Sequence, residues 1–110
     1  MGSHLAEYLL SETKWELDLL IRYRSPLDNL QRLVPIANEG RVIRFLYADL
    51  RDELSIRAAV KASRPQYVFH LAAQSFPQAS FSAPLDTYDT NVQGTHRLLE
   101  ALREYAPEAL

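Results

Sequence analysis

The 110-residue chain has no cysteine, which excludes disulfide bonds, zinc–thiolate sites and a thiol nucleophile. No apolar run approaches the ~20 residues that a membrane-spanning helix requires. Met1-Gly2-Ser3-His4 leads directly into a helical pattern, without the charged and apolar regions of a signal peptide. The same four residues also begin many expression tags, so that alternative stays open. Together these features predict a cytoplasmic protein.

Charge is nearly balanced, with 12 basic and 14 acidic residues and a formal net charge of −2. This composition gives no electrostatic reason to expect a nucleic acid or an anionic membrane as partner. Metal binding is not indicated either, because the three histidines, His4, His70 and His96, lack the spacing of a ligand set. A length of 110 residues suits one domain and not two.

Hydrophobic periodicity predicts alternating helices and strands. Apolar residues recur at helical spacing in residues 4–11, 52–64 and 85–104, and a proline at a first helical position favours a further helix over 26–38. Short runs rich in strand-forming residues occupy 17–21, 41–47 and 66–71. A stretch rich in Ala, Ser, Gln and Pro, residues 72–84, is predicted as a loop. Such alternation predicts an α/β fold with a parallel sheet flanked by helices.

Four segments, in order and with consistent spacing, resemble the extended short-chain dehydrogenase/reductase family. They are Gly2–Leu10, Tyr47-Ala48-Asp49-Leu50-Arg51-Asp52, His70-Leu71-Ala72-Ala73-Gln74-Ser75, and Thr90-Asn91-Val92-Gln93-Gly94-Thr95 followed by Leu98-Leu99-Glu100-Ala101. They are most similar to the NAD-dependent epimerase/dehydratase branch with its GDP-mannose 4,6-dehydratase-like enzymes. The resemblance implies that residues 1–110 form an incomplete NAD(P)-binding Rossmann domain whose first strand would precede Gly2.

The resemblance also implies which residues would contact the dinucleotide. Gly2 matches the last glycine of the turn that admits the pyrophosphate, although a flexible second residue is the simpler reading. Asp49 and Leu50 would lie against the adenine, unless Asp49 only starts the next helix. Arg22 would favour a ribose 2′-phosphate, and hence NADP over NAD, because guanidinium groups pair well with phosphate; the alternative is a solvated arginine.

The remaining implied contacts follow the strand predicted at 66–71. Small residues there would let the backbone pass close to the cofactor, and Ser75 would face the sugar nucleotide. The residues concerned are Leu71, Ala72, Ala73 and Gln74. His70 is more simply a packing residue. Gly94 suggests close packing because glycine costs up to ~1 kcal/mol in a helix interior, and Asn91 is either a brace beneath the active site or a helix-start residue.

The family's catalytic pair is absent from these 110 residues. Its hydride transfer uses a tyrosine with a lysine four positions later, and none of the six tyrosines has one. Three hypotheses remain. The first is part of a nucleotide-sugar dehydratase or epimerase (a lyase or isomerase), with a GDP-sugar as substrate of the full-length parent. The second is a non-catalytic nucleotide-binding or assembly module. The third is a structural remnant, and the exposed strand edges of any such partial sheet favour self-association.

Overall fold

The computed structural model describes residues 1–22, 43–73 and 77–110. They form two compact units, residues 1–47 and 48–110. The helix predicted at 26–38 lies outside the described residues. Within the part described, no helix is both long and apolar enough to cross a membrane, and no three His, Cys, Asp or Glu side chains are grouped to hold a metal ion.

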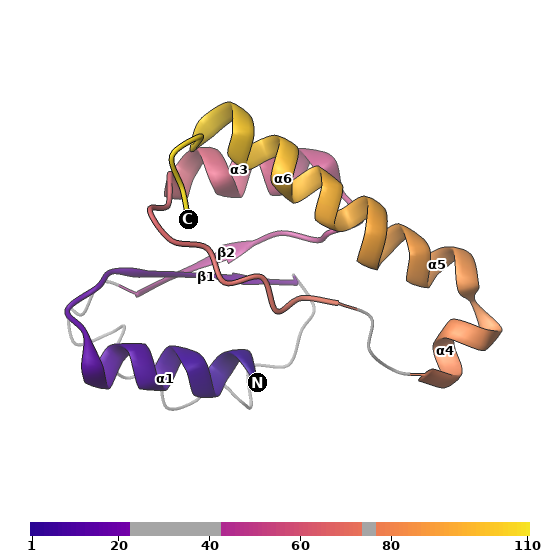
Figure 1. Cartoon of the computed structure of the whole chain (residues 1–110), viewed down its shortest axis with the longest axis horizontal. Coiled ribbons are helices and arrows are strands. Elements are labelled where there is room, and N and C mark those ends of the chain that lie inside the picture. The colour runs from indigo at the N-terminus through magenta and orange to yellow at the C-terminus, as the bar shows by residue number, and fades with distance from the viewer. Residues whose placement is uncertain (23–42, 74–76) are drawn as a thin grey trace. The chain divides into compact units, whose positions relative to one another are not determined.

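In its described residues, the first unit has one helix and a two-stranded parallel sheet (Figure 1). Helix α1 spans Gly2–Glu12, strand β1 Leu17–Ile21 and strand β2 Ile43–Tyr47. The strands pair in register from Leu17 opposite Ile43 to Ile21 opposite Tyr47. The sequence predicts β1 with the same bounds, and the described part of the strand predicted at 41–47 is confirmed.

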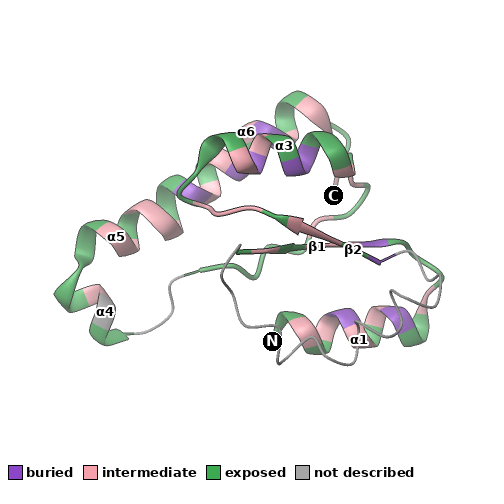
Figure 2. Ribbon diagram, turned by 180° about the vertical axis from the view of Figure 1, so that it is seen from behind, coloured by how far each residue is buried: buried purple, intermediate pink, exposed green. Residues whose placement is uncertain are grey.

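A small apolar cluster joins α1 to this sheet. Ala6 and Leu10 of α1 form one buried cluster with Leu17 of β1 and Ile43 of β2. Figure 2 shows buried positions along α1 in purple. Ala6 and Leu10 are four positions apart, so they lie on one face of the helix. On the sheet, Asp18 and Arg44 are direct cross-strand neighbours joined by two hydrogen bonds of 2.8 and 2.7 Å.

The second unit is built around two helices that lie side by side, α3 over Glu53–Ser63 and α6 over Gly94–Tyr105. Ile56 and Val60 of α3 pack against Leu98 and Ala101 of α6. The predicted cap is confirmed, because the Asp52 side chain accepts a hydrogen bond from the backbone N–H of Leu54.

The last helix differs from the single element predicted over 85–104. It is divided into α5 over Pro84–Tyr88, a π-helical segment η2 over Asp89–Gln93, and α6. A further short helix, α4 over Pro77–Ser82, lies in the stretch predicted as a loop. A π-helical turn accommodates an extra residue within a helix, and such turns are frequent at functional sites.

The strand predicted at 66–71 is wrong, because these residues form no strand in the structure. Their backbone makes two hydrogen bonds with Leu110: the Leu110 N–H donates to the Gln66 carbonyl, and the Val68 N–H donates to the Leu110 carbonyl. Val, Tyr and Phe fit a pleated sheet, but a strand requires a continuous ladder with a neighbour. Among the described residues, the segment 66–71 has such backbone pairing only with Leu110.

Candidate functional site

Residues 49–52 form a tight polar turn between β2 and α3 in the chain. The Asp49 carboxylate accepts hydrogen bonds from the Arg51 backbone N–H at 2.9 Å and from the Arg51 guanidinium at 3.0 and 3.2 Å. The Asp49 carbonyl accepts a hydrogen bond from the backbone N–H of Asp52, and the Asp49 N–H donates a hydrogen bond to the Ser55 hydroxyl. The side-chain cap of α3 is therefore Asp52, and Asp49 has a separate position in the turn.

Arg51 links this turn to helix α5. Its Nη1 lies 3.5 Å from a carboxylate oxygen of Asp86, while its other guanidinium nitrogens bond Asp49. The hydrogen bond with Asp49 is the main reason that the pKa of Arg51 is raised above its ordinary value. The guanidinium is thus a permanent positive charge beside a carboxylate whose side chain is 32% exposed.

Gly94 at the start of α6 packs directly on the turn. A Cβ at Gly94 would lie 2.7 Å from the Leu50 Cβ and 3.1 Å from the Leu50 carbonyl oxygen. Both distances are shorter than ordinary van der Waals contact, so only glycine fits without a shift. The close packing predicted for Gly94 is confirmed, and its partner is one of the residues expected near the adenine.

Thr95, the next residue of α6, makes a hydrogen bond with His70, in the segment that follows α3. The Thr95 hydroxyl lies 3.0 Å from His70 Nε2 and donates a hydrogen bond to the Asn91 carbonyl at 2.7 Å. Consecutive residues of one helix therefore contact both the Asp49–Leu50 turn and the residue before Leu71. Two of the segments that resemble the family are brought together on the N-terminal turn of α6.

The other predicted site residues are distributed over the chain. In the first unit, Gly2 is exposed at the start of α1, and Arg22 is exposed after β1. In the second unit, Leu71, Ala72 and Ala73 are exposed. Gln74 and Ser75 lie outside the described residues.

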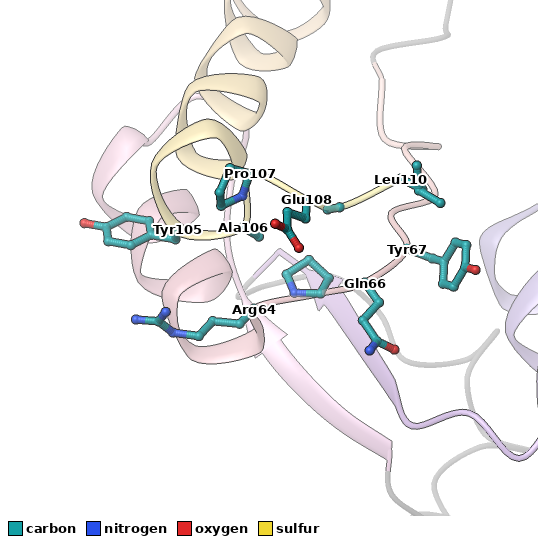
Figure 3. Close-up of a pocket in the computed structure, with 10 residues that line it drawn as sticks. Arg64, Gln66, Tyr67, Tyr105, Ala106, Pro107, Glu108 and Leu110 are labelled. Carbon is teal, nitrogen blue, oxygen red and sulfur yellow. The ribbon is translucent and has the colours of Figure 1, made fainter.

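A shallow pocket of about 540 Å³ opens elsewhere in the second unit (Figure 3). Its walls come from the turn after α3 and from the C-terminal segment, residues 64–67 and 105–110. Arg64 begins this wall in a left-handed conformation, φ 45°, which ends α3. None of the predicted site residues lines the pocket, so it offers no support for a cofactor position.

Sequence reasoning missed Arg97, which the structure places at the turn. Arg97 Nη1 donates to the Leu50 carbonyl at 2.9 Å, and Nη2 donates to the Asp89 carboxylate at 2.7 Å. Helix spacing places Arg97 on the same face as Gly94, three positions earlier, but it does not identify the Leu50 carbonyl as the partner.

Comparison with solved structures defines the class of protein. The chain superposes with a TM-score of 0.75 and 31% identity on the UDP-glucose 4-epimerase of Thermus thermophilus, solved in complex with NAD, covering 94% of this chain and 30% of that one. It superposes with a TM-score of 0.74 and 27% identity on the dTDP-glucose 4,6-dehydratase DesIV of Streptomyces venezuelae, solved with NAD bound, covering 94% and 33%. The fold is therefore part of the Rossmann-type fold of these enzymes, with a parallel sheet and flanking helices.

Sequence comparison then identifies the family. A family model described as GDP-mannose 4,6 dehydratase matches residues 1–109, and the chain belongs to this family. It is 38% identical over 109 residues to GDP-mannose 4,6 dehydratase 2 of Arabidopsis thaliana, covering 94% of this chain and 29% of the relative. It is 39% identical over 106 residues to a probable dTDP-glucose 4,6-dehydratase of Sinorhizobium fredii, covering 96% and 29%. The resemblance inferred from the four segments is confirmed, and the chain spans about 30% of these relatives' length.

Proposed function

We propose that this chain is the dinucleotide-binding part of a nucleotide-sugar 4,6-dehydratase and that it binds NAD(P) through the turn at Asp49–Leu50. The observation that carries the proposal is the close packing of Leu50 on Gly94, which fixes the turn against α6. An adenine ring lying on Leu50 would place its amino group within reach of the Asp49 carboxylate.

Family membership supports, by analogy, the rest of the proposed site. Gly2 would admit the pyrophosphate, and Arg22 would pair with a 2′-phosphate, which favours NADP. The backbone of Leu71, Ala72, Ala73 and Gln74 would pass the nicotinamide end, and Ser75 would face the substrate. The related enzymes named above act on UDP-, dTDP- and GDP-sugars, and we propose a GDP-sugar for the parent of this chain.

Catalysis is proposed to depend on residues other than these 110. The tyrosine and lysine that the family uses for hydride transfer are absent from the chain as given. Asn91 would support the active site from the π-helical segment, where its carbonyl accepts the Thr95 hydroxyl. The chain would then contribute cofactor binding and not the acid–base step.

Binding measurements on the 110-residue chain test the proposal. Isothermal titration with NADPH, NADH and ADP-ribose is expected to show binding that Asp49→Ala weakens about tenfold, the effect of losing one hydrogen bond to a charged group. Asp86→Ala is the matched control, because Asp86 contacts the same Arg51 without taking part in the proposed adenine contact. The proposal fails if millimolar cofactor produces no binding, or if both variants lose affinity equally.

A further inference from the structure

We propose that Arg97 is a positioning residue that sets the conformation of the Asp49–Leu50 turn and thereby its affinity for an adenine nucleotide. The inference rests on the proposed function. Arg97 touches no proposed ligand atom; it acts through the Leu50 carbonyl, which it holds at 2.9 Å. The backbone of the turn makes a second hydrogen bond to a side chain at Asp49, whose N–H donates to the Ser55 hydroxyl.

The guanidinium of Arg97 is itself fixed from a second side. Its Nη2 donates to the Asp89 carboxylate at 2.7 Å and to the Gln93 side-chain oxygen at 3.3 Å. The Arg97 side chain is only 22% exposed. Because a guanidinium is planar and presents its donors in a rigid fork, anchoring one nitrogen on Asp89 determines where the other points.

The π-helical segment explains how Asp89 reaches Arg97. Asp89 and Arg97 are eight positions apart in the sequence. In an uninterrupted α-helix, positions i and i+7 share a face more closely than i and i+8. Because η2 accommodates one extra residue, Asp89 and Arg97 lie about two helical turns apart and therefore on the same face of the helix. Asp89, Gln93 and Arg97 can therefore form one polar row along the helix.

Gly94 and Arg97 act on the same residue by different means. The absence of a side chain at Gly94 allows the Leu50 side chain and carbonyl to lie close to α6. Arg97 donates a hydrogen bond to that carbonyl in this position. Loss of the bond would leave a partly buried carbonyl without this donor, a cost that favours rotation of the peptide away from the helix. The Leu50 carbonyl and the Arg51 N–H belong to one planar peptide group, so the same rotation would displace the N–H that donates to the Asp49 carboxylate.

The test compares Arg97→Lys and Arg97→Met with Arg103→Met in the 110-residue chain. Arg103 lies on the same helix, is 72% exposed and pairs with Glu100, so it controls for loss of a helix arginine. Titration with ADP-ribose is expected to show about tenfold weaker binding for Arg97→Met, the loss of one charge-assisted hydrogen bond. Affinity for nicotinamide mononucleotide, which lacks adenine, is expected to match that of Arg103→Met. Arg97→Lys should recover part of the loss, because an ammonium can make one of the two contacts.

Hydrogen–deuterium exchange of the free chain supplies a readout that needs no ligand. The amides of Arg51 and Asp52, both bonded to Asp49 in the structure, are expected to exchange faster in Arg97→Met while the amides of α3 keep their protection. Unchanged exchange and unchanged ADP-ribose affinity would overturn the proposal. If the unsubstituted 110-residue chain binds neither nucleotide, the proposed function fails and the nucleotide role of Arg97 fails with it. If the unsubstituted chain binds ADP-ribose but the Arg97 variants show none of the expected losses, only the inference about Arg97 fails.

Discussion

Gly94 and Leu50, 44 positions apart in sequence, approach so closely that a Cβ on the glycine would lie 2.7 Å from the leucine Cβ. Substituting Gly94→Ala is therefore expected to lower the free energy of unfolding by roughly 1–2 kcal/mol, because the overpacking cost of ~1–3 kcal/mol exceeds the gain in helix propensity of up to ~1 kcal/mol. Urea denaturation measures the change. His96→Ala, on an exposed position of the same helix, should leave stability within ~0.5 kcal/mol. A stabilised Gly94→Ala chain would show that the turn does not pack on α6.

Two adjacent leucines of α6 provide a sharper test of the helix pair. Leu98 is 7% exposed within the cluster of Ile56, Val60 and Ala101, whereas Leu99 is 59% exposed. Leu98→Ala is expected to cost ~2–5 kcal/mol through the cavity it leaves, and Leu99→Ala no more than ~0.5 kcal/mol. Chemical denaturation followed by far-UV circular dichroism separates the two. Equal effects would mean that α6 presents a different face to α3.

The Asp52 cap should stabilise α3 through a single hydrogen bond to the Leu54 N–H. Asp52→Ala is expected to reduce stability by ~1 kcal/mol, whereas Asp52→Asn, which keeps an acceptor oxygen, should lose much less. Thermal melts of the two variants at neutral pH provide the comparison. An equal loss in both would indicate that the negative charge at the helix N-terminus matters more than the acceptor.

The exposed pair of Glu100 and Arg103 makes a prediction about pH. The hydrogen bond from Arg103 holds the pKa of the Glu100 carboxyl below its ordinary value. A carboxyl whose pKa is lower in the folded state contributes stability above its unfolded-state pKa and loses that contribution as pH falls through the folded-state value. Carbon-detected NMR titration should show the Glu100 pKa rising toward the ordinary value in Arg103→Gln but not in Lys14→Gln. An unchanged value in Arg103→Gln would show that the pair does not persist in solution.

Cofactor preference follows from the proposed role of Arg22. Arg22→Asp is expected to weaken binding of NADPH at least about tenfold relative to NADH, because a charge-assisted hydrogen bond to phosphate is replaced by repulsion. The ratio of the two dissociation constants is the measurement. Lys14→Asp makes the same change of charge on another exposed residue and should leave the ratio unchanged. A ratio unaffected by Arg22→Asp would place the 2′-phosphate, or the preference itself, elsewhere.

The amino-acid sequence determined the local elements whose signals are contained in a few consecutive residues. The apolar run Leu17–Ile21 predicted β1 with the observed bounds, and Asp52 with Ile56, Ala59 and Val60 predicted α3 and its cap. Four short segments were enough to predict the family that the comparisons confirm. These features succeed because caps, periodicity and motif spacing are set by neighbours in the chain.

Only the tertiary structure decided what depends on partners distant in sequence. Residues 66–71 have the side chains of a strand but pair, among the described residues, only with Leu110, because strands need neighbours that the sequence of the segment cannot supply. Likewise, Arg97 has no motif of its own, and its place at the turn follows from folding Leu50 onto Gly94 and from the extra residue in η2. Long-range packing selects one partner among many that local chemistry would allow, so the carbonyl that Arg97 bonds could not be predicted before the fold was seen.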